Sequence, residues 1–261
     1  MSRALTISSS ANPLVKEVRR AVERGGLTSA GCCVGETFHL LDEALRSGVA
    51  EQVLASETAR PAVEERLQTR CELSLTILPD KLFDSISSTE TSQGVVVLVK
   101  PRAWSMDDVF EPIPLVLVLD AIQDPGNAGS MVRAAEAFGA TGVVFARGSV
   151  SPFNPKTLRG SAGSLFRIPF VHGVRVSDIA TECDRRGVQR FAAVAAGDWG
   201  DPDFRRPCAL IIGSESHGVS EELAAGATAV SIPMRTIESL NAAVAAGILL
   251  YEAGRQRSAL K

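Results

Sequence analysis

Residues 115–140, LVLVLDAIQDPGNAGSMVRAAEAFGA, pass from a continuous apolar segment through a turn into a helical pattern. The run LVLVLD predicts a strand that is buried on both faces, and DPGN predicts the turn. Asn127 is well placed to cap the helix that follows. A buried strand, a turn and a helix in this order are typical of an α/β fold with a parallel sheet.

The same alternation continues toward the C-terminus. Further apolar runs predict strands at TGVVFA (141–146), RFAAVAA (190–196), CALIIG (208–213) and AVSIPM (229–234). Continuous apolar strands that alternate with helices indicate a mostly parallel sheet covered on both faces, and ligands of such sheets bind beyond the carboxyl ends of the strands. We therefore expect the functional site in the loops DAIQDPGNAGSMVR, GSESHG and IPMRTIESLN.

The first half of the chain predicts a second, smaller α/β domain. Residues 12–24, NPLVKEVRRAVER, place apolar side chains on one helical stripe and basic side chains largely off it. The buried strand GVVVLVK (94–100) is followed by PRAWSMDDVFEPIP, whose three prolines indicate a linker. We place the domains at 1–108 and 109–261, and nothing in the first half predicts catalysis.

Composition indicates a globular protein. The 261 residues are 45% hydrophobic, no apolar run approaches the ~18 residues of a membrane span, and the N-terminus lacks the apolar segment of a secretory signal. We expect a cytoplasmic protein. The five cysteines, an odd number, form no CxxC pair and have no histidine at ligand spacing, so reduced structural thiols and no metal are expected.

The charge distribution is more informative than the net charge. A net charge of −3 does not favour a nucleic-acid binder. However, residues 137–177 carry five basic side chains and no acidic one, and residues 1–35 carry an excess of basic side chains. Two local basic patches and a scatter of arginines over a solvated surface are both compatible with this pattern.

The first loop raises the question of why Arg133 is there. Gly126, Gly129 and Arg133 follow one another at spacings of three and four, so they share a helical face with room beside the guanidinium. The helix dipole disfavours a cation near a helix N-terminus. This position suggests that an anion of a substrate or partner compensates the charge. A plain surface arginine is the alternative.

The other two loops supply polar groups at strand ends. Glu215 presents a carboxylate in GSESHG (213–218), whereas His217 is expected to be a loop or surface residue. IPMRTIESLN (232–241) leads into a long helix that ends near Arg257, with Ser239 as its expected N-cap. Ser239 and Asn241 thus offer neutral hydrogen-bonding groups.

Several common site motifs do not occur. No GxGxxG follows a first strand, and there is no Walker A motif, zinc motif or GxSxG elbow. The sequence therefore supports neither a dinucleotide-binding Rossmann unit nor the usual Rossmann-type methyltransferase loop, a P-loop nucleotidase or an α/β-hydrolase.

Taken together and in this order, the three loops resemble the SpoU (TrmH-like) family of RNA ribose 2'-O-methyltransferases in the SPOUT superfamily. The matching segments are QDPGNAGSMVRAAEAFGA, NPKTLRGSAGSLFRIP, LIIGSESHGVS and SIPMRTIESLNAAVAAGILLYE. The segments SSSANPLVKEVRR and SSTETSQGVVVLV are similar to the L30e-like RNA-binding domain found ahead of many such enzymes.

The resemblance implies a parallel sheet tied in a deep trefoil knot, a homodimer, and S-adenosylmethionine held by the backbone of Gly213, Ile232 and Leu240. The ribose 2'-hydroxyl attacks the methyl group in line and loses a proton, which requires positioning and charge stabilisation. By resemblance Arg133 contacts the target ribose or its phosphate, and its high pKa favours an electrostatic role over that of a base. The resemblance further implies that Asn127 and Glu215 organise the arginine loop and that Ser239 and Asn241 position the ribose.

Two positions depart from the family pattern. Thr236 stands where a glycine is usual, and a β-branched residue would be strained there if the position needed a positive φ; Ala243 replaces a serine. The expected substrate is ribosomal RNA, by analogy of the N-terminal domain. A transfer RNA 2'-O-methyltransferase, a catalytically silent RNA-binding paralogue and an unrelated cofactor-binding α/β enzyme remain alternatives.

Overall fold

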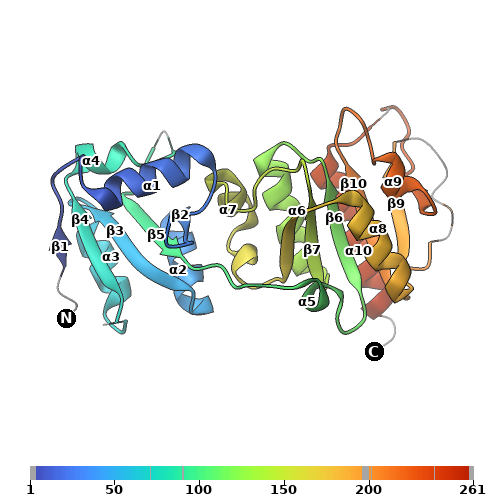
Figure 1. Ribbon diagram of the computed structural model, residues 1–261, viewed down its shortest axis with the longest axis horizontal. Coiled ribbons are helices and arrows are strands. Elements are labelled where there is room, and N and C mark those ends of the chain that lie inside the picture. Colours follow the sequence, from blue (N-terminus) through green and yellow to red (C-terminus); the bar gives the residue numbers. More distant parts are fainter. Residues whose placement is uncertain are drawn as a thin grey trace. The chain divides into compact units, whose positions relative to one another are not determined.

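The computed structural model describes residues 4–70, 72–89, 91–195, 200, 202–237 and 239–258. The chain forms two compact units (Figure 1). Unit 1 consists of Met1–Ala103 and Phe153–Arg167, and unit 2 consists of Trp104–Pro152 and Ile168–Lys261. The proposed domain limits 1–108 and 109–261 stay a prediction, but residues 153–167 pack with the first unit although they follow the linker.

Unit 1 is a five-stranded mixed sheet with helices. Its elements are β1 (Leu5–Thr6), α1 (Pro13–Arg24), β2 (Cys33–Glu36), α2 (Phe38–Ser47), β3 (Ala50–Ser56), α3 (Arg60–Leu67), β4 (Ser74–Leu78), α4 (Asp80–Asp84), β5 (Val95–Val99), α7 (Pro155–Ser161) and a 3-10 turn at Ser164–Phe166. The strand order is β1-β4-β3-β5-β2, with β5 antiparallel to both of its neighbours.

Helix α1 forms as its sequence predicts. Asn12 accepts a hydrogen bond from the Leu14 amide at 2.9 Å, and Gly25 ends the helix with φ +59°. Val15 and Val18 are fully buried in a cluster with Phe83, which follows from the apolar stripe. Lys16, Arg20 and Arg24 are exposed on the outer side, whereas Arg19 is half-buried and donates to Ser85.

The segment 153–167 is fixed to unit 1 by polar contacts. The buried Glu43 on α2 forms ion pairs with Arg46 at 2.5 Å and with Arg167. Arg159 on α7 donates a hydrogen bond to Ser88 Oγ at 2.8 Å. Because a buried carboxylate is costly without partners, these pairs tie the segment to α2 and to the loop before β5.

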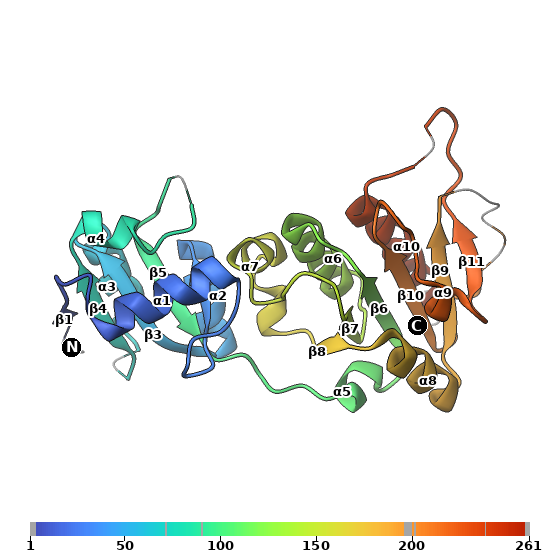
Figure 2. The ribbon, with the colours of Figure 1, turned by 45° about the horizontal axis from the view of Figure 1, so that its top comes forward.

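Unit 2 is a six-stranded, entirely parallel sheet in the order β11-β9-β10-β6-β7-β8, which Figure 2 shows from one edge to the other. Its elements are α5 (Met106–Phe110), β6 (Leu115–Asp120), α6 (Pro125–Ala137), β7 (Gly142–Ala146), β8 (Phe170–Val174), α8 (Val176–Arg186), β9 (Gln189–Val194), β10 (Cys208–Gly213), α9 (Glu221–Ala224), β11 (Thr228–Ser231) and α10 (Ala242–Ser258). The predicted parallel α/β sheet is confirmed.

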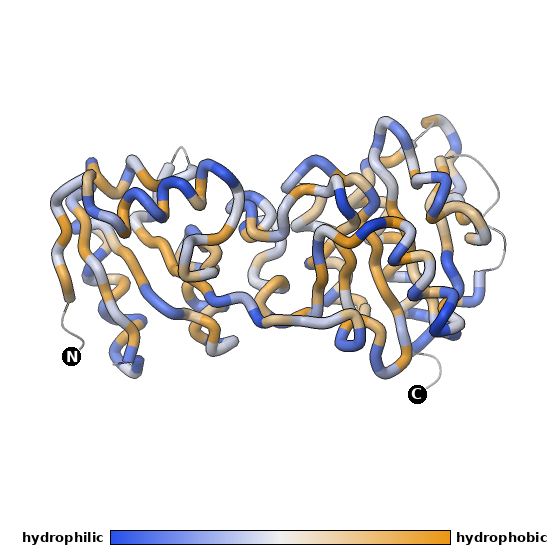
Figure 3. Tube along the Cα trace, in the orientation of Figure 1, coloured by the Kyte–Doolittle hydropathy of each residue, from blue (hydrophilic) through white to orange (hydrophobic). Residues whose placement is uncertain are grey.

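Both faces of this sheet are covered. Val116 and Ile211 pack in one cluster with residues of α5, α8 and α9. Their neighbours Leu117 and Leu210 point to the other face, on which α10 packs against α6 and β10. Figure 3 shows hydrophobic residues along the strands and polar residues on the outer helices. Burial on both faces explains why the strands read as continuous apolar runs.

Two predicted helix caps are wrong. Asp124, not Asn127, caps α6, since its carboxylate accepts from the Asn127 amide at 2.6 Å and Pro125 occupies the first helical position. Asn241, not Ser239, caps α10, because its side-chain oxygen accepts from the amides of Ala243 at 2.9 Å and Val244 at 3.2 Å. The side chain of Asn127 is thereby left for other contacts.

Four of the cysteines are free and buried, while Cys71 lies outside the described residues. Burial raises the pKa of Cys33 to about 12 and the pKa values of Cys183 and Cys208 to about 11. Such thiols stay protonated at neutral pH, as expected of structural cysteines. Among the described residues, no helix is long and apolar enough to cross a membrane.

Arg257 near the end of α10 is expected to be important for stability. Its guanidinium donates to the carbonyl oxygens of Phe204, Ile113, Pro114 and Arg206 at 2.6–3.0 Å. We expect Arg257→Met to lower the free energy of unfolding by about 3 kcal/mol, because partly buried carbonyl groups lose their donor. Urea unfolding measures this change.

The matched control is Arg255→Met on the same helix. Arg255 is exposed and pairs only with Glu252 in the described part of the chain, so its loss is expected to cost less than about 0.5 kcal/mol. Equal effects of the two substitutions would show that the carbonyl contacts of Arg257 contribute nothing specific.

Candidate functional site

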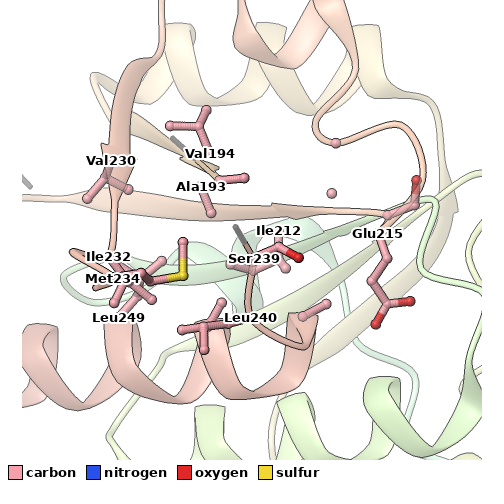
Figure 4. Close-up of a pocket in the computed structure, with 16 residues that line it drawn as sticks. Ala193, Val194, Ile212, Glu215, Val230, Ile232, Met234, Ser239, Leu240 and Leu249 are labelled. Atoms are coloured by element: carbon pink, nitrogen blue, oxygen red, sulfur yellow. The ribbon is translucent and has the colours of Figure 1, made fainter. Parts of the chain in front are cut away.

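A pocket lies where β9, β10 and β11 end and α10 begins (Figure 4). It is lined by Ala193, Val194, Ala195, Ile212, Gly213, Ser214, Glu215, Gly218, Val230, Ile232, Met234, Ser239, Leu240, Ala242, Ala245 and Leu249. Figure 4 shows an apolar group around Val230, Ile232, Met234 and Leu249, with the Glu215 carboxylate away from it. Carboxyl ends of parallel strands thus form the pocket, as the sequence predicts.

Three predicted site residues from three different loops are joined by hydrogen bonds. Asn127 Nδ2 on α6 donates to Glu215 Oε1 at 2.9 Å, and Asn241 Nδ2 donates to Asn127 Oδ1 at 3.0 Å. Because Asn241 also accepts from the backbone of α10, its amide orientation is fixed, and so in turn is that of Asn127. The chain of contacts holds the carboxylate of Glu215 at the edge of the pocket.

The GSESHG loop turns tightly on itself. Gly218 donates its amide to Ser214 O at 2.8 Å, and a side-chain carbon on Gly213 would lie only 2.0 Å from the backbone carbon of Gly218. Position 213 therefore needs glycine for a close backbone approach. His217 is exposed and its Nδ1 contacts Ser216 Oγ at 2.8 Å, in agreement with a loop or surface residue.

Asp120 joins the end of β6 to the chain that follows the GSESHG loop, at the same edge of the sheet. It ends β6, is only 3% exposed, and its Oδ2 accepts from the Ser220 amide at 2.7 Å. The buried carboxylate thus holds the chain after the GSESHG loop against β6. Asp120 has a positioning role for the loop and does not line the pocket.

Arg133 is not brought into this cluster. It lies on the exposed side of α6, about 9 Å along the helix axis from Asn127, and it does not line the pocket. Within the described part of the chain, no hydrogen bond or ion pair of Arg133 is found. The guanidinium is therefore accessible to an anionic group that approaches from outside.

The remaining predicted positions fall in the segment before α10. Ile232, Ser239 and Leu240 line the pocket, together with Gly213 at the end of β10. Thr236 is exposed and does not have a positive φ, so the expected backbone strain does not arise. The departure from glycine is therefore compatible with this backbone.

The contribution of β9 to the pocket is not predicted from the sequence. Ala193, Val194 and Ala195 at the end of this strand line the pocket, yet no polar motif marks them. The apolar run RFAAVAA does predict a strand of the same sheet, and this is the one feature of the sequence that points to β9. What could not be known was that β9 lies beside β10, because sequence does not give strand order.

The arrangement suits an amphipathic organic ligand better than a metal ion. Apolar side chains and bare backbone form the wall, and a carboxylate with two amides forms the rim. Among the described residues, no group of three His, Cys, Asp or Glu side chains is placed to bind a metal.

Comparison with known proteins gives a family match over this unit. Residues 114–251 match the model of the SpoU rRNA Methylase family. These limits include the pocket, the Asn127–Glu215–Asn241 cluster and Arg133.

Similar proteins extend over nearly the whole chain. An uncharacterized tRNA/rRNA methyltransferase of Synechocystis is 33% identical, covering 97% of this chain and 94% of the relative. The 23S rRNA (guanosine(2553)-2'-O)-methyltransferase RlmP of Bacillus subtilis is 31% identical over 94% of this chain and 97% of its own. The crystal structure of the SpoU methyltransferase AviRb from Streptomyces viridochromogenes with AdoMet is 28% identical, with a TM-score of 0.83 and coverage of 95% and 98%.

Proposed function

The chain belongs to the SpoU rRNA Methylase family, and on that basis we propose that it transfers a methyl group from S-adenosylmethionine to a ribose 2'-hydroxyl of ribosomal RNA. The observation that carries this proposal is the Asn127–Glu215–Asn241 cluster at the rim of a pocket lined by Gly213, Ile232 and Leu240. Asn127, Glu215 and Asn241, which we assign to the reaction, thus lie beside the residues that we assign to the methyl donor, whereas Arg133 lies farther along α6.

The pocket fits the methyl donor by its chemistry. Gly213, Ile232 and Leu240 offer backbone groups, and Val230, Met234 and Leu249 offer apolar contact to a base and a ribose. The close approach at Gly213 shows that the loop cannot accept a side chain there. S-adenosylmethionine, when bound, supplies the electrophilic methyl group.

The protein's own residues would position the acceptor and stabilise charge. Ser239 and Asn241 lie at the start of α10 and hold the target ribose in our proposal. Arg133 is exposed and without a partner in the described part of the chain, so its guanidinium can contact the ribose or its phosphate. A guanidinium remains protonated, and it therefore stabilises the oxyanion that develops as the hydroxyl loses its proton.

Ribosomal RNA is favoured as substrate. The Bacillus relative named for 23S rRNA matches this chain along 94% of its length, and so includes the N-terminal half. In our proposal the N-terminal half selects the RNA and therefore acts as a substrate-binding domain. Transfer RNA remains the alternative, since the name of the Synechocystis relative includes both substrates.

Domain roles and the knot belong to the same proposal. We assign residues 1–108 to an L30e-like RNA-binding domain and 109–261 to the methyltransferase domain, acting in the cytoplasm on ribosomal RNA. The insertion of β10 between β6 and β9, and the return of α10 onto α6 and β10, support a trefoil knot in the C-terminal part of unit 2.

An apolar stripe on α10 supports a homodimer. Val244, Ile248 and Tyr251 are 50%, 37% and 56% exposed and recur at spacings of four and three, so they share one helical face. The Tyr251 ring lies edge-on to Phe138 with ring centroids 5.6 Å apart, which extends the apolar surface to the end of α6. A second copy of this chain covers the stripe in our proposal.

Charge on this stripe is expected to break the dimer. Ile248→Asp would place an unpaired carboxylate in an apolar interface, which is strongly unfavourable. We expect a monomer in sedimentation analysis. Ile113→Asp, at a residue that is 58% exposed and lies off α10, is the control and should leave the dimer intact. A dimeric Ile248→Asp variant would exclude this interface.

Glu215 offers a test of the site itself. Glu215→Ala removes the acceptor that Asn127 uses, whereas Glu215→Gln keeps an oxygen at the same place. We expect methyl transfer to fall roughly 10- to 100-fold with alanine, as for a lost hydrogen bond to a charged group, and less than about fivefold with glutamine. Initial rates with labelled S-adenosylmethionine measure both. Full activity of the alanine variant would remove Glu215 from the site.

A further inference from the structure

We propose that Lys16, Arg20 and Arg24 of α1, together with Lys156 of α7, form one surface on unit 1 that binds the phosphate backbone of RNA. This inference rests on the proposed function for the identity of the partner, but it assigns the contact to a surface away from the pocket. It also explains two basic segments of the sequence that the methyl-transfer site does not use.

The three residues of α1 form a stripe. They follow one another at spacings of four, so their side chains lie on one side of the helix and their Cα atoms recur about every 6 Å along its axis. All three are exposed, while Val15, Val18 and Ala21 face the core. The helix thus presents its cations to solvent over about 12 Å.

These cations are available. Within the described part of the chain, Lys16, Arg20, Arg24 and Lys156 have no ion pair or hydrogen bond through their side chains. Two carboxylates share α1. Glu17 accepts hydrogen bonds from the amide of Ser29 and from its hydroxyl and attracts the charge of Arg20 without a direct ion pair, and Glu23 is exposed. Helix α1 therefore keeps four basic residues against two acidic ones.

The surface is also concave. A groove beside α1 is lined by Lys16, Arg20 and Arg24 and by the hydroxyl residues Thr28 and Ser29 of the following loop. Glu17 is the only acidic residue among those that line it. The Ser29 hydroxyl is engaged by Glu17 and the Thr28 hydroxyl by the Cys32 amide, so the three cations of α1 are the groups of this groove that suit a phosphate strand.

Helix α7 extends this surface from the second basic segment. A side-chain carbon on Gly25, at the end of α1, would lie 2.8 Å from Nδ2 of Asn154, which caps α7. Lys156 follows two residues later and is exposed (Figures 1 and 2 show α7 beside this end of α1). Thus residues far apart in sequence contribute to one basic surface of unit 1.

The spacing matches a nucleic-acid strand. A strand carries one phosphate per ~3.4 Å of helix axis, so cations about 6 Å apart meet roughly every second phosphate. Such contacts release counterions and carry no sequence information, so they position the RNA and leave the choice of nucleotide to other groups. A negative net charge of the whole chain does not oppose this, because local cations dominate within a Debye length.

The test is the salt dependence of RNA binding by the full-length protein. Binding of a fluorescent oligouridylate is measured between 0.05 and about 1 M salt for the wild type, Arg20→Gln/Arg24→Gln, and the control Arg60→Gln/Arg70→Gln. The control removes the same charge from the same unit, at the start of α3 and just beyond its end. All four positions are exposed, so folding should be unchanged, which circular dichroism checks.

We expect the Arg20→Gln/Arg24→Gln variant to lose two phosphate contacts. The slope of log K against log salt should be smaller in magnitude by about 1.4, since each contact with a single strand contributes about 0.7. If the affinities are equal near 1 M salt, binding by the variant is roughly 25-fold weaker at 0.1 M. The control should match the wild type. Equal slopes for all three proteins, equal losses in both variants, or no binding by the wild type would overturn the inference.

This result is independent of the proposed reaction. If the wild type binds RNA through α1 but transfers no methyl group, the proposed function fails and the surface assignment stands. If methyl transfer occurs and the slope is unchanged, only the surface assignment fails.

Discussion

Gly213→Ala is expected to weaken S-adenosylmethionine binding by at least about 100-fold. A side-chain carbon at this position would lie 2.0 Å and 2.1 Å from the carbonyl carbon and oxygen of Gly218 and 2.3 Å from the amide nitrogen of Val219. These neighbours are backbone atoms, so the loop that lines the pocket must move as a whole. Isothermal titration calorimetry with S-adenosylmethionine measures the loss.

Gly218→Ala is the matched control in the same loop. Gly218 has φ +68°, but a side-chain carbon there has nothing within 4 Å. The variant therefore carries only the backbone strain, which costs about 1 kcal/mol of folding stability, and its affinity for the donor should fall by less than about fivefold. If Gly213→Ala bound the donor as well as Gly218→Ala does, the pocket would not be the donor site.

Arg133→Ala is expected to lower the rate of methyl transfer at least about 100-fold, as for loss of one charge-stabilising donor. Because Arg133 does not line the pocket, the affinity for S-adenosylmethionine should change by less than about twofold. Arg133→Lys should recover only part of the rate, since an ammonium lacks the forked donors of a guanidinium. Single-turnover rates and donor affinity are measured for each variant.

Arg185→Ala controls for a general loss of positive charge. Arg185 is exposed on α8, on the other face of the sheet from α6, and pairs with Glu182. We expect its methyl transfer to stay within about twofold of the wild type. An Arg133→Ala variant with unchanged rate and an intact fold would show that our assignment of this residue is wrong.

Much of the fold could be predicted because unit 2 is regular. Buried parallel strands are marked by apolar runs such as LVLVLD and CALIIG, and the ends of such strands indicate where ligands bind. That rule placed Gly213 and Glu215 correctly at the edge of the pocket. Helix α1 was predictable for the same reason, since its apolar stripe and its cap agree.

Other features depend on tertiary contacts that local sequence does not encode. The sequence predicts Asn127 and Ser239 as caps and Asn241 as a site residue, and only the structure shows that Asp124 caps α6 while Asn241 both caps α10 and binds Asn127. The association of residues 153–167 with unit 1 is likewise a tertiary event, carried by Glu43 and Arg167. Sequence spacing could not predict a contact between residues so far apart.

The proposed reaction is tested most directly by transfer of labelled methyl groups from S-adenosylmethionine to total RNA from cells that lack this gene. We expect label in ribosomal RNA at a single linkage that resists alkali, because a 2'-O-methyl group removes the hydroxyl that alkali needs for cleavage. Label in a base, or no label in any RNA from a folded protein that binds the donor, would contradict it.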